Sequence, residues 1–196
     1  MRTSSVDNGR RAIAAGEVVL GIDLGTHLGW AVIDSDGLRV DSGAYELKPK
    51  KHPGMRWRAA RVLFAELLAQ RRPGLLAYED VVRHQAAGRP NFRAAQVYGG
   101  LLSHLLLAAL EHDPGLLVVA LAPSEVKKRA TASGAAKKDD MRAAAAWRWD
   151  RDFESADEAD ACWVAWAALQ GEGHAPGAGH ARGGKKNPLA GRTIGC

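Results

Sequence analysis

Two short apolar runs in this sequence each end in acidic residues. Residues 18–23 close with Asp23, and residues 75–80 close with Glu79 and Asp80. Apolar runs of this length predict buried β-strands. A carboxylate is costly to bury without a partner. Acids at the ends of two such strands therefore favour an edge of a sheet where solvent or a cation meets them.

The other predicted elements complete a mixed sheet. Runs at 29–33 and 38–47 flank a hairpin turn and, with the first strand, predict an antiparallel meander. A further strand is expected at 116–121. Helices are expected at 55–70, 91–112, 137–149 and 156–170, with a short helix capped by Ser124 and a loop at 81–90. This order predicts an α/β fold in which five strands are flanked by helices, with ligands at the carboxyl ends of parallel strands.

A second acidic motif opens the last predicted helix. Ser155 and Glu158 have the spacing of a capping box, which places the helix start at this point. Asp157 and Asp160 are three residues apart and share one helix face. Their place near the helix amino terminus favours ionised carboxylates, although acids at helix starts are also ordinary electrostatics.

Composition limits the classes of protein that fit. At 196 residues, the chain predicts one domain at 17–170, a flexible basic arm at 1–16 and a disordered tail at 171–196. The net charge of +5 favours a polyanionic partner. Two cysteines, Cys162 and Cys196, form no disulfide framework or zinc pattern. No segment predicts a signal peptide or a membrane span, so a reducing cytoplasmic location is expected.

Together the four acids predict a metal centre. Asp23, Glu79, Asp157 and Asp160 offer hard oxygen ligands of the kind that suit Mg²⁺ or Mn²⁺. Two such ions can activate a water and stabilise the leaving oxygen of a phosphodiester. Taken singly, each acid is equally explained as a strand or helix end exposed to solvent.

The motifs that carry these acids resemble the RuvC-like Holliday junction resolvases of the RNase H-like fold. They are GIDLGT at 21–26, YED at 78–80 and DEADA at 157–161, and the resemblance spans about residues 18–169. It implies that the four acids are the catalytic metal ligands of a Mg²⁺-dependent endonuclease. It also implies paired nicks in four-way DNA junctions that leave 5′ phosphate and 3′ hydroxyl ends, and a location in a bacterial cytoplasm or a phage-infected host cell.

The same resemblance identifies a basic segment. APSEVKK at 122–128 and residues 134–141 match the family's lysine-bearing region. Lys127 and Lys138 are thereby expected to bind the DNA backbone or stabilise the transition state, while a solvated charged helix face explains them equally well. The full set of expected DNA contacts is Lys127, Lys128, Lys137, Lys138 and Arg83.

Two departures from the family pattern point toward phage-type members. Leu24 stands where bacterial members usually have proline after the first acid. Val82 stands where they carry an aromatic residue that wedges into the junction. Phe92 is a possible substitute, although a core role at a helix start is the expected one. These departures leave the cleavage preference and any branch-migration partner open.

Two other functions fit part of the pattern. GIDLGT also resembles the first phosphate loop of actin-like and sugar-kinase ATPases, but those proteins need a second lobe and a second glycine-rich loop. A junction-binding protein that does not cut would keep the basic surface without needing the acids. An RNA-directed or broader branch-cutting enzyme stays within the nuclease class. The tryptophans at helical spacing, Trp147, Trp149, Trp163 and Trp166, are expected in the core.

The helix at 91–112 predicts a homodimer. It is apolar around more of its circumference than one buried face requires. Gly99 and Gly100 would let a second backbone approach closely. The crowded leucines are Leu101, Leu102, Leu105, Leu106 and Leu107. Burial of all of them within the monomer is the alternative, and the family resemblance favours the dimer.

Overall fold

The computed structural model describes residues 13–48, 52–81, 85–86 and 89–171. The strands are β1 (Val18–Asp23), β2 (His27–Asp34), β3 (Val40–Glu46), β4 (Leu75–Glu79), β5 (Gln85–Ala86), β6 (Arg89–Pro90) and β7 (Leu117–Leu121). The helices are α1 (Met55–Arg71), α2 (Phe92–His112), α3 (Pro123–Thr131), α4 (Lys138–Trp149) and α5 (Ala156–Leu169). None of the helices in these ranges combines the length and apolar character needed to cross a membrane.

Five strands form the predicted mixed sheet, in the order β3-β2-β1-β4-β7. The first three pair antiparallel, as the meander required. β1 then pairs parallel with β4, and β4 pairs parallel with β7. The register places Ile22 beside Tyr78, so Asp23 and Glu79 follow at neighbouring positions on adjacent strands. The mixed five-stranded α/β sheet predicted from the sequence is confirmed.

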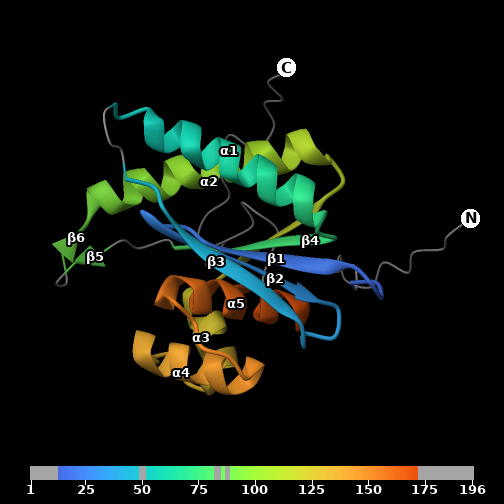
Figure 1. Ribbon diagram of the computed structural model, residues 1–196. Helices are drawn as coiled ribbons and strands as arrows, with labels where there is room; N and C mark the ends of the chain where they lie inside the picture. The colour runs from blue at the N-terminus through green and yellow to red at the C-terminus, as the bar shows by residue number, and fades with distance from the viewer. Residues whose placement is uncertain (1–12, 49–51, 82–84, 87–88, 172–196) are drawn as a thin grey trace, which may run out of the picture.

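Helices cover both faces of this sheet (Figure 1). On one face, α1 and α2 bury Phe64, Leu68, Leu101 and Leu105 against alternate residues of the strands. On the other face α5 lies directly on the sheet, and α3 and α4 pack outside it. Alternation along β1 follows from the pleat, since successive side chains point to opposite faces. It turns Leu20 toward α1 and α2, and Val19 toward α5.

Two glycines allow α5 to lie flush on the sheet. A Cβ added to Gly21 would collide with the backbone of Ala161 and Ala165. A Cβ added to Gly29 would collide with the carbonyl oxygen of Asp157. Gly29 pairs with Asp23 across β1 and β2, so the close approach occurs beside the first acid. Backbone contact at these two positions therefore sets how near the acids of α5 come to β1.

Several local predictions are wrong. The short helix is capped at Ala122, with Pro123 as its first residue, rather than at Ser124. Proline is favoured there because its missing N–H would have no helical partner and its φ already suits the helix. Phe92 is 80% exposed rather than buried, and Trp147 is 87% exposed. The loop expected at 81–90 contains the two-stranded β5–β6 ladder.

Most of the predicted terminal segments lie outside the described residues. That holds for residues 1–12 of the expected arm and for 172–196 of the expected tail. Residues 13–16 of the arm are described, and Ile13 packs against the core beneath α5.

Candidate metal centre

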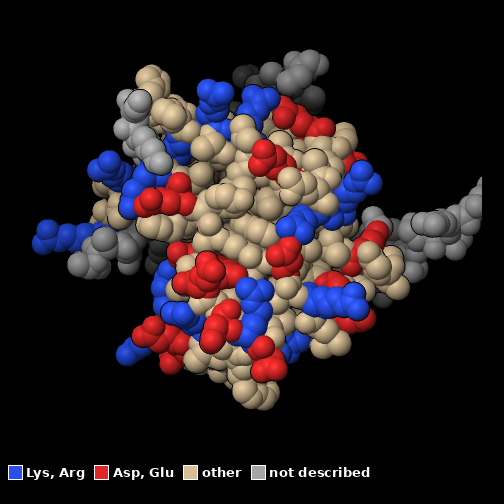
Figure 2. Space-filling model, viewed as in Figure 1, with Lys and Arg blue, Asp and Glu red and all other residues tan. Residues whose placement is uncertain are grey.

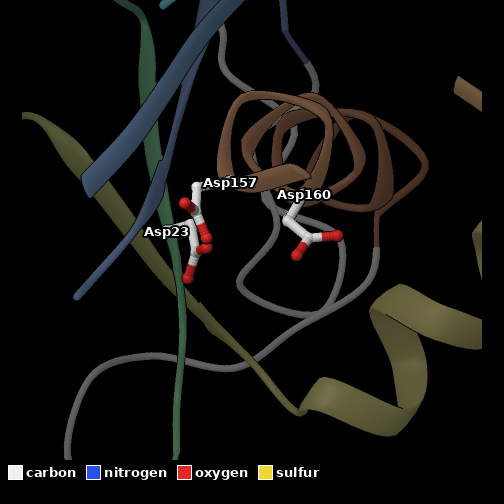
Figure 3. A group of neighbouring side chains, drawn as sticks. All are labelled: Asp23, Asp157 and Asp160. Atoms are coloured by element: carbon white, nitrogen blue, oxygen red, sulfur yellow. The ribbon is translucent and has the colours of Figure 1, made fainter. Parts of the chain in front are cut away.

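Three of the four predicted acids lie together where β1 meets α5. Asp23, Asp157 and Asp160 each place one carboxylate oxygen within 4.8 Å of the other two. Figure 3 shows the side chain of Asp23 beside that of Asp157, with Asp160 next to them on the same helix as Asp157. Two oxygens on opposite sides of a bound Mg²⁺ are about 4.2 Å apart, from metal–oxygen distances of about 2.1 Å. The three carboxylates are thus close to the span that one divalent ion bridges.

The start of α5 fixes the direction of its two acids. Ser155 caps the helix, and its hydroxyl oxygen accepts a hydrogen bond from the Glu158 N–H at 3.1 Å. The reciprocal half of the predicted capping box is absent, because the Glu158 carboxylate accepts from the Glu154 N–H at 3.0 Å instead. Asp157 and Asp160 then project from one face, and their side chains are only 23% and 17% exposed.

Glu79 lies outside the group of three but acts on it electrostatically. The negative charge of Glu79 is the first among the neighbouring carboxylates that raise the pKa of Asp23. Its backbone is held by Tyr98 of α2, whose hydroxyl donates to the Glu79 carbonyl at 2.6 Å. The same hydroxyl accepts from the Val81 N–H at 3.2 Å. Tyr98 thereby fixes the end of β4 from which Glu79 projects.

The acids are held in an environment that disfavours their charged forms. Burial, with the charges of Glu79, Asp160 and Asp157, raises the pKa of Asp23 well above its usual value. Burial also raises the pKa of Glu79 to about 7, helped by the charge of Asp160. The pKa of Asp160 is raised to about 6, again chiefly by burial. A nearby positive charge is therefore needed to stabilise these crowded carboxylates in their ionised form.

Lysines from α3 and α4 place positive charge near these carboxylates. The Lys138 ammonium lies 3.1 Å from Asp157 Oδ1 and 3.9 Å from Asp160 Oδ2. Burial lowers the pKa of Lys138, but the hydrogen bond to Asp157 and the nearby acids outweigh it, so the net pKa is raised. The charge of Lys127 lowers the pKa values of Glu79 and Asp160, which places Lys127 near the same centre.

The remaining predicted DNA contacts are more scattered. Lys128 and Lys137 are exposed, on α3 and at the residue that caps α4. Arg83 lies outside the described residues. Figure 2 shows the face viewed in Figure 1, where Lys and Arg lie interspersed with Asp and Glu instead of forming one continuous basic patch.

The donor set fits a hard divalent cation. Every candidate ligand is a carboxylate oxygen, which suits Mg²⁺ or Mn²⁺ and offers none of the nitrogen or sulfur donors typical of zinc. Asp23, Asp157 and Asp160 could hold one ion directly. Glu79 ends the strand next to that of Asp23 and is not part of this group of three.

Sequence reasoning missed the residues that hold the acids in place. Gly29 follows the first acid by six positions in a strand, and a glycine inside a strand can signal a close backbone approach. Tyr98 lies in an apolar helix and gives no such signal. Neither do Ser42 and Arg151, whose hydrogen bonds to Glu158 span 116 and 7 positions of the chain.

Fold and centre together define a class of protein. A meander of three antiparallel strands that continues into parallel strands, covered by helices, is the RNase H-like arrangement expected from the sequence. Carboxylates at the end of the first strand and on a helix packed across it complete that pattern.

Comparisons with solved structures give the particular relatives. RuvC of T. thermophilus in complex with a Holliday junction substrate superposes with a TM-score of 0.69 and 24% identity, covering 81% of this chain and 99% of that one. A second Thermus thermophilus RuvC structure superposes with a TM-score of 0.66 and 25% identity, with the same coverage of both chains. The yeast mitochondrial Holliday junction resolvase Ydc2 superposes with a TM-score of 0.56 and 17% identity, covering 82% of this chain and 81% of that one.

The predicted resemblance to RuvC-like resolvases is thereby confirmed at the level of structure. Neither a family model nor a curated protein sequence matches the chain.

Proposed function

We propose that this protein is a metal-dependent, structure-selective endodeoxyribonuclease that resolves Holliday junctions. The observation that carries the proposal is the convergence of Asp23, Asp157 and Asp160 on one cation-sized space. The likeness to a RuvC bound to a Holliday junction substrate supports the choice of branched DNA. A protein that only bound junctions would gain nothing from a half-buried cluster of acids with raised pKa values.

The proposed chemistry assigns a role to each charged residue. Bound Mg²⁺, for which Mn²⁺ would substitute, supplies activation of a water and stabilisation of the departing 3′ oxygen. Each active site would hold two ions, and their ligands would be Asp23, Asp157, Asp160 and Glu79. Lys138, already at the rim of the cluster, contacts the scissile phosphate and stabilises charge that develops on it. The products carry a 5′ phosphate and a 3′ hydroxyl.

Affinity for DNA comes from the basic residues around this centre. Lys127, Lys128 and Lys137 are proposed to bind backbone phosphates on either side of the cut, and Arg83 is proposed to do so from the segment after β4. Such contacts position the duplex without reading its sequence. Removal of a metal ligand should therefore leave binding nearly intact.

The test is a cleavage gel that compares a four-way junction with linear duplex of the same sequence in Mg²⁺. Wild-type protein should nick the junction and spare the duplex, without added ATP. Asp23→Asn should abolish nicking and still shift the junction in a binding gel. Asp36→Asn, an exposed turn residue, is the matched control and should cut normally. Cutting at the wild-type rate by Asp23→Asn would refute the catalytic assignment.

The ATPase alternative is not favoured by the fold. Actin-like and sugar-kinase proteins bind nucleotide between two lobes. The described residues form one five-stranded sheet and one two-stranded ladder.

A homodimer through α2 is part of the proposal. Leu107 and Leu110 are 54% and 58% exposed, and a Cβ added to Gly99 would meet no atom within 4 Å. Gly100 does not contribute, because the ring of Trp57 on α1 fills the space above it. The exposed face of α2 is therefore narrower than predicted, since Leu101 and Leu105 are buried within the monomer. Two sites related by a two-fold axis would allow paired nicks in symmetric strands.

A further inference from the structure

A buried carboxylate lies between the two acids of α5 and does not take part in the cluster. Glu158 is 3% exposed and is the one charged side chain that is buried in the described part of the chain. Its Oε1 accepts from the Ser42 hydroxyl at 2.7 Å and from Arg151 Nη2 at 2.8 Å. Its Oε2 accepts from the Glu154 N–H at 3.0 Å. Both oxygens are thus committed to partners other than a metal.

These bonds join three separate segments of the fold. Ser42 lies on the edge strand β3, where it pairs with Ala31 of β2. Arg151 lies in the connection between α4 and α5, and its guanidinium stacks 4.7 Å from the ring of Phe153. Glu158 lies in the first turns of α5. A single carboxylate therefore ties the amino end of α5 both to the sheet and to the preceding connection.

Because of helix geometry, the hydrogen bonds of Glu158 also fix the rotation of α5 about its axis. Successive residues of an α-helix are about 100° apart around its axis. Glu158 directly follows Asp157 in the chain, so fixing Glu158 against Ser42 and Arg151 fixes the rotation of the turn. That rotation turns the face that carries Asp157 and Asp160 toward Asp23. The apolar residues of the same turns, Ala159 and Ala161, are buried against the sheet but have no polar group that fixes the rotation in this way.

Stability alone does not account for the ion pair. Burying two charges is expensive, and replacing a buried pair by apolar side chains is often neutral or stabilising. What an ion pair with hydrogen bonds adds is a defined orientation. Arg151 also neutralises Glu158, so a further acid stands beside the cluster without adding to its repulsion.

We propose that Ser42, Arg151 and Glu158 form an anchor that orients the metal-binding face of α5 and so sets the affinity of the centre for divalent cations. The inference rests on the proposed function, because it assigns these three residues a positioning role toward the proposed metal ligands. None of the three contacts the metal or the DNA in this role.

The test separates orientation from stability with two kinds of variant. The double variant Arg151→Leu, Glu158→Leu removes both charges and fills the space with apolar side chains. Ser42→Ala removes the hydrogen bond to Glu158 and keeps the ion pair, and Ser42→Thr restores a hydroxyl. Each protein is titrated with Mn²⁺, followed by the electron paramagnetic resonance signal of free Mn²⁺. Each is also assayed for junction cleavage against Mg²⁺ concentration and for its urea unfolding midpoint.

We expect the double variant to bind Mn²⁺ about 10-fold more weakly, because residues that orient metal ligands typically contribute 10- to 100-fold in affinity. Its unfolding midpoint should be unchanged or higher. Ser42→Ala should shift the Mg²⁺ dependence in the same direction by a smaller factor, with KM for the junction unchanged, and Ser42→Thr should restore it. The control removes the exposed Arg61–Glu111 pair, which joins α1 to α2, and should leave metal affinity unchanged.

Several results would overturn the inference. One is a folded double variant with wild-type affinity for Mn²⁺. If the double variant does not fold, wild-type Mg²⁺ dependence in Ser42→Ala decides the question in the same way. A wild-type protein that cuts junctions while the anchor variants cut identically would leave the proposed function standing and remove the anchor. A wild-type protein that neither binds Mn²⁺ nor cuts would remove the proposed function and the anchor with it.

Discussion

Replacing Glu79 by glutamine should stabilise the metal-free protein at alkaline pH. Burial and the charge of Asp160 raise the pKa of Glu79 from 4.5 to about 7. Between these two values the folded chain binds more protons than the unfolded chain. Its stability therefore falls as pH rises through this range. Glutamine has nearly the same shape and carries no charge, so it removes this penalty.

The size of the effect follows from the shift in pKa. Each pKa unit corresponds to about 1.4 kcal/mol, so the difference between 4.5 and about 7 sets an upper value of about 3 kcal/mol above pH 8. The new amide needs hydrogen-bond partners of its own, which reduces the gain to about 1–3 kcal/mol. For a chain of this length, each kcal/mol raises Tm by about 2–4 °C. At pH 5 the same reasoning leaves a gain of less than about 1 kcal/mol.

The assay is thermal unfolding of wild-type protein and Glu79→Gln in chelator, at pH 8 and at pH 5. Glu66→Gln, on the exposed side of α1, is the matched control and should leave Tm unchanged at both values. Saturating Mg²⁺ should stabilise the wild type more than the variant, because a ligand that binds only the folded state raises its stability. An unchanged Tm at pH 8, or an equal rise at pH 5, would refute the electrostatic account of the acidic centre.

Three other predictions address the proposed activity, the DNA contacts and assembly. Because Glu79 and Asp160 have raised pKa values of about 7 and about 6, protons should compete with the metal. The Mg²⁺ concentration for half-maximal cleavage should therefore fall from pH 6 to pH 8, and a flat profile would contradict this. Lys127→Ala should cut more slowly, and one lost phosphate contact should flatten the slope of log K against log salt by about 0.9. An unchanged slope would mean that Lys127 only solvates the surface. Sedimentation equilibrium should give about twice 20.9 kDa for the wild type and a lower mass for Leu107→Glu, whereas Leu38→Glu, at an exposed leucine away from α2, should remain a dimer. A wild-type monomer at micromolar concentration would end the dimer proposal.

The sheet was predictable because each of its strands carries its own local signal. The run that ends in Asp23 and the run that ends in Glu79 are short, apolar and bounded by turns, which is enough to define strands. Their parallel pairing follows from the helix between them, since a crossover connection is what parallel neighbours require. Side-chain environment was less predictable. Trp147 has the helical spacing of a core residue, yet it lies on the outer face of α4 because the second helix layer is packed from one side only.

The candidate site was predictable in its acids and not in its supports. The spacing of Asp157 and Asp160 after a capping serine predicted that both lie on one face at the start of a helix. No sequence pattern predicted the partner Ser42 of Glu158, because a hydrogen bond across 116 residues forms only once the sheet has formed and α5 has docked on it. Tyr98 shows the same limit, since its hydroxyl reaches the end of β4 from an otherwise apolar helix. Long-range positioning contacts leave no periodic trace in a single sequence.

The close approach of backbones explains why these acids form a site at all. An ion with metal–oxygen distances of about 2.1–2.4 Å cannot bridge ligand atoms more than about 5 Å apart. The oxygens of Asp23, Asp157 and Asp160 lie within 4.8 Å of one another, which meets this requirement. Because a Cβ added to Gly29 would collide with the Asp157 carbonyl oxygen, we expect any side chain there to displace the start of α5 from β2. We therefore expect the proposed metal affinity to depend on Gly29 as well as on the carboxylates themselves.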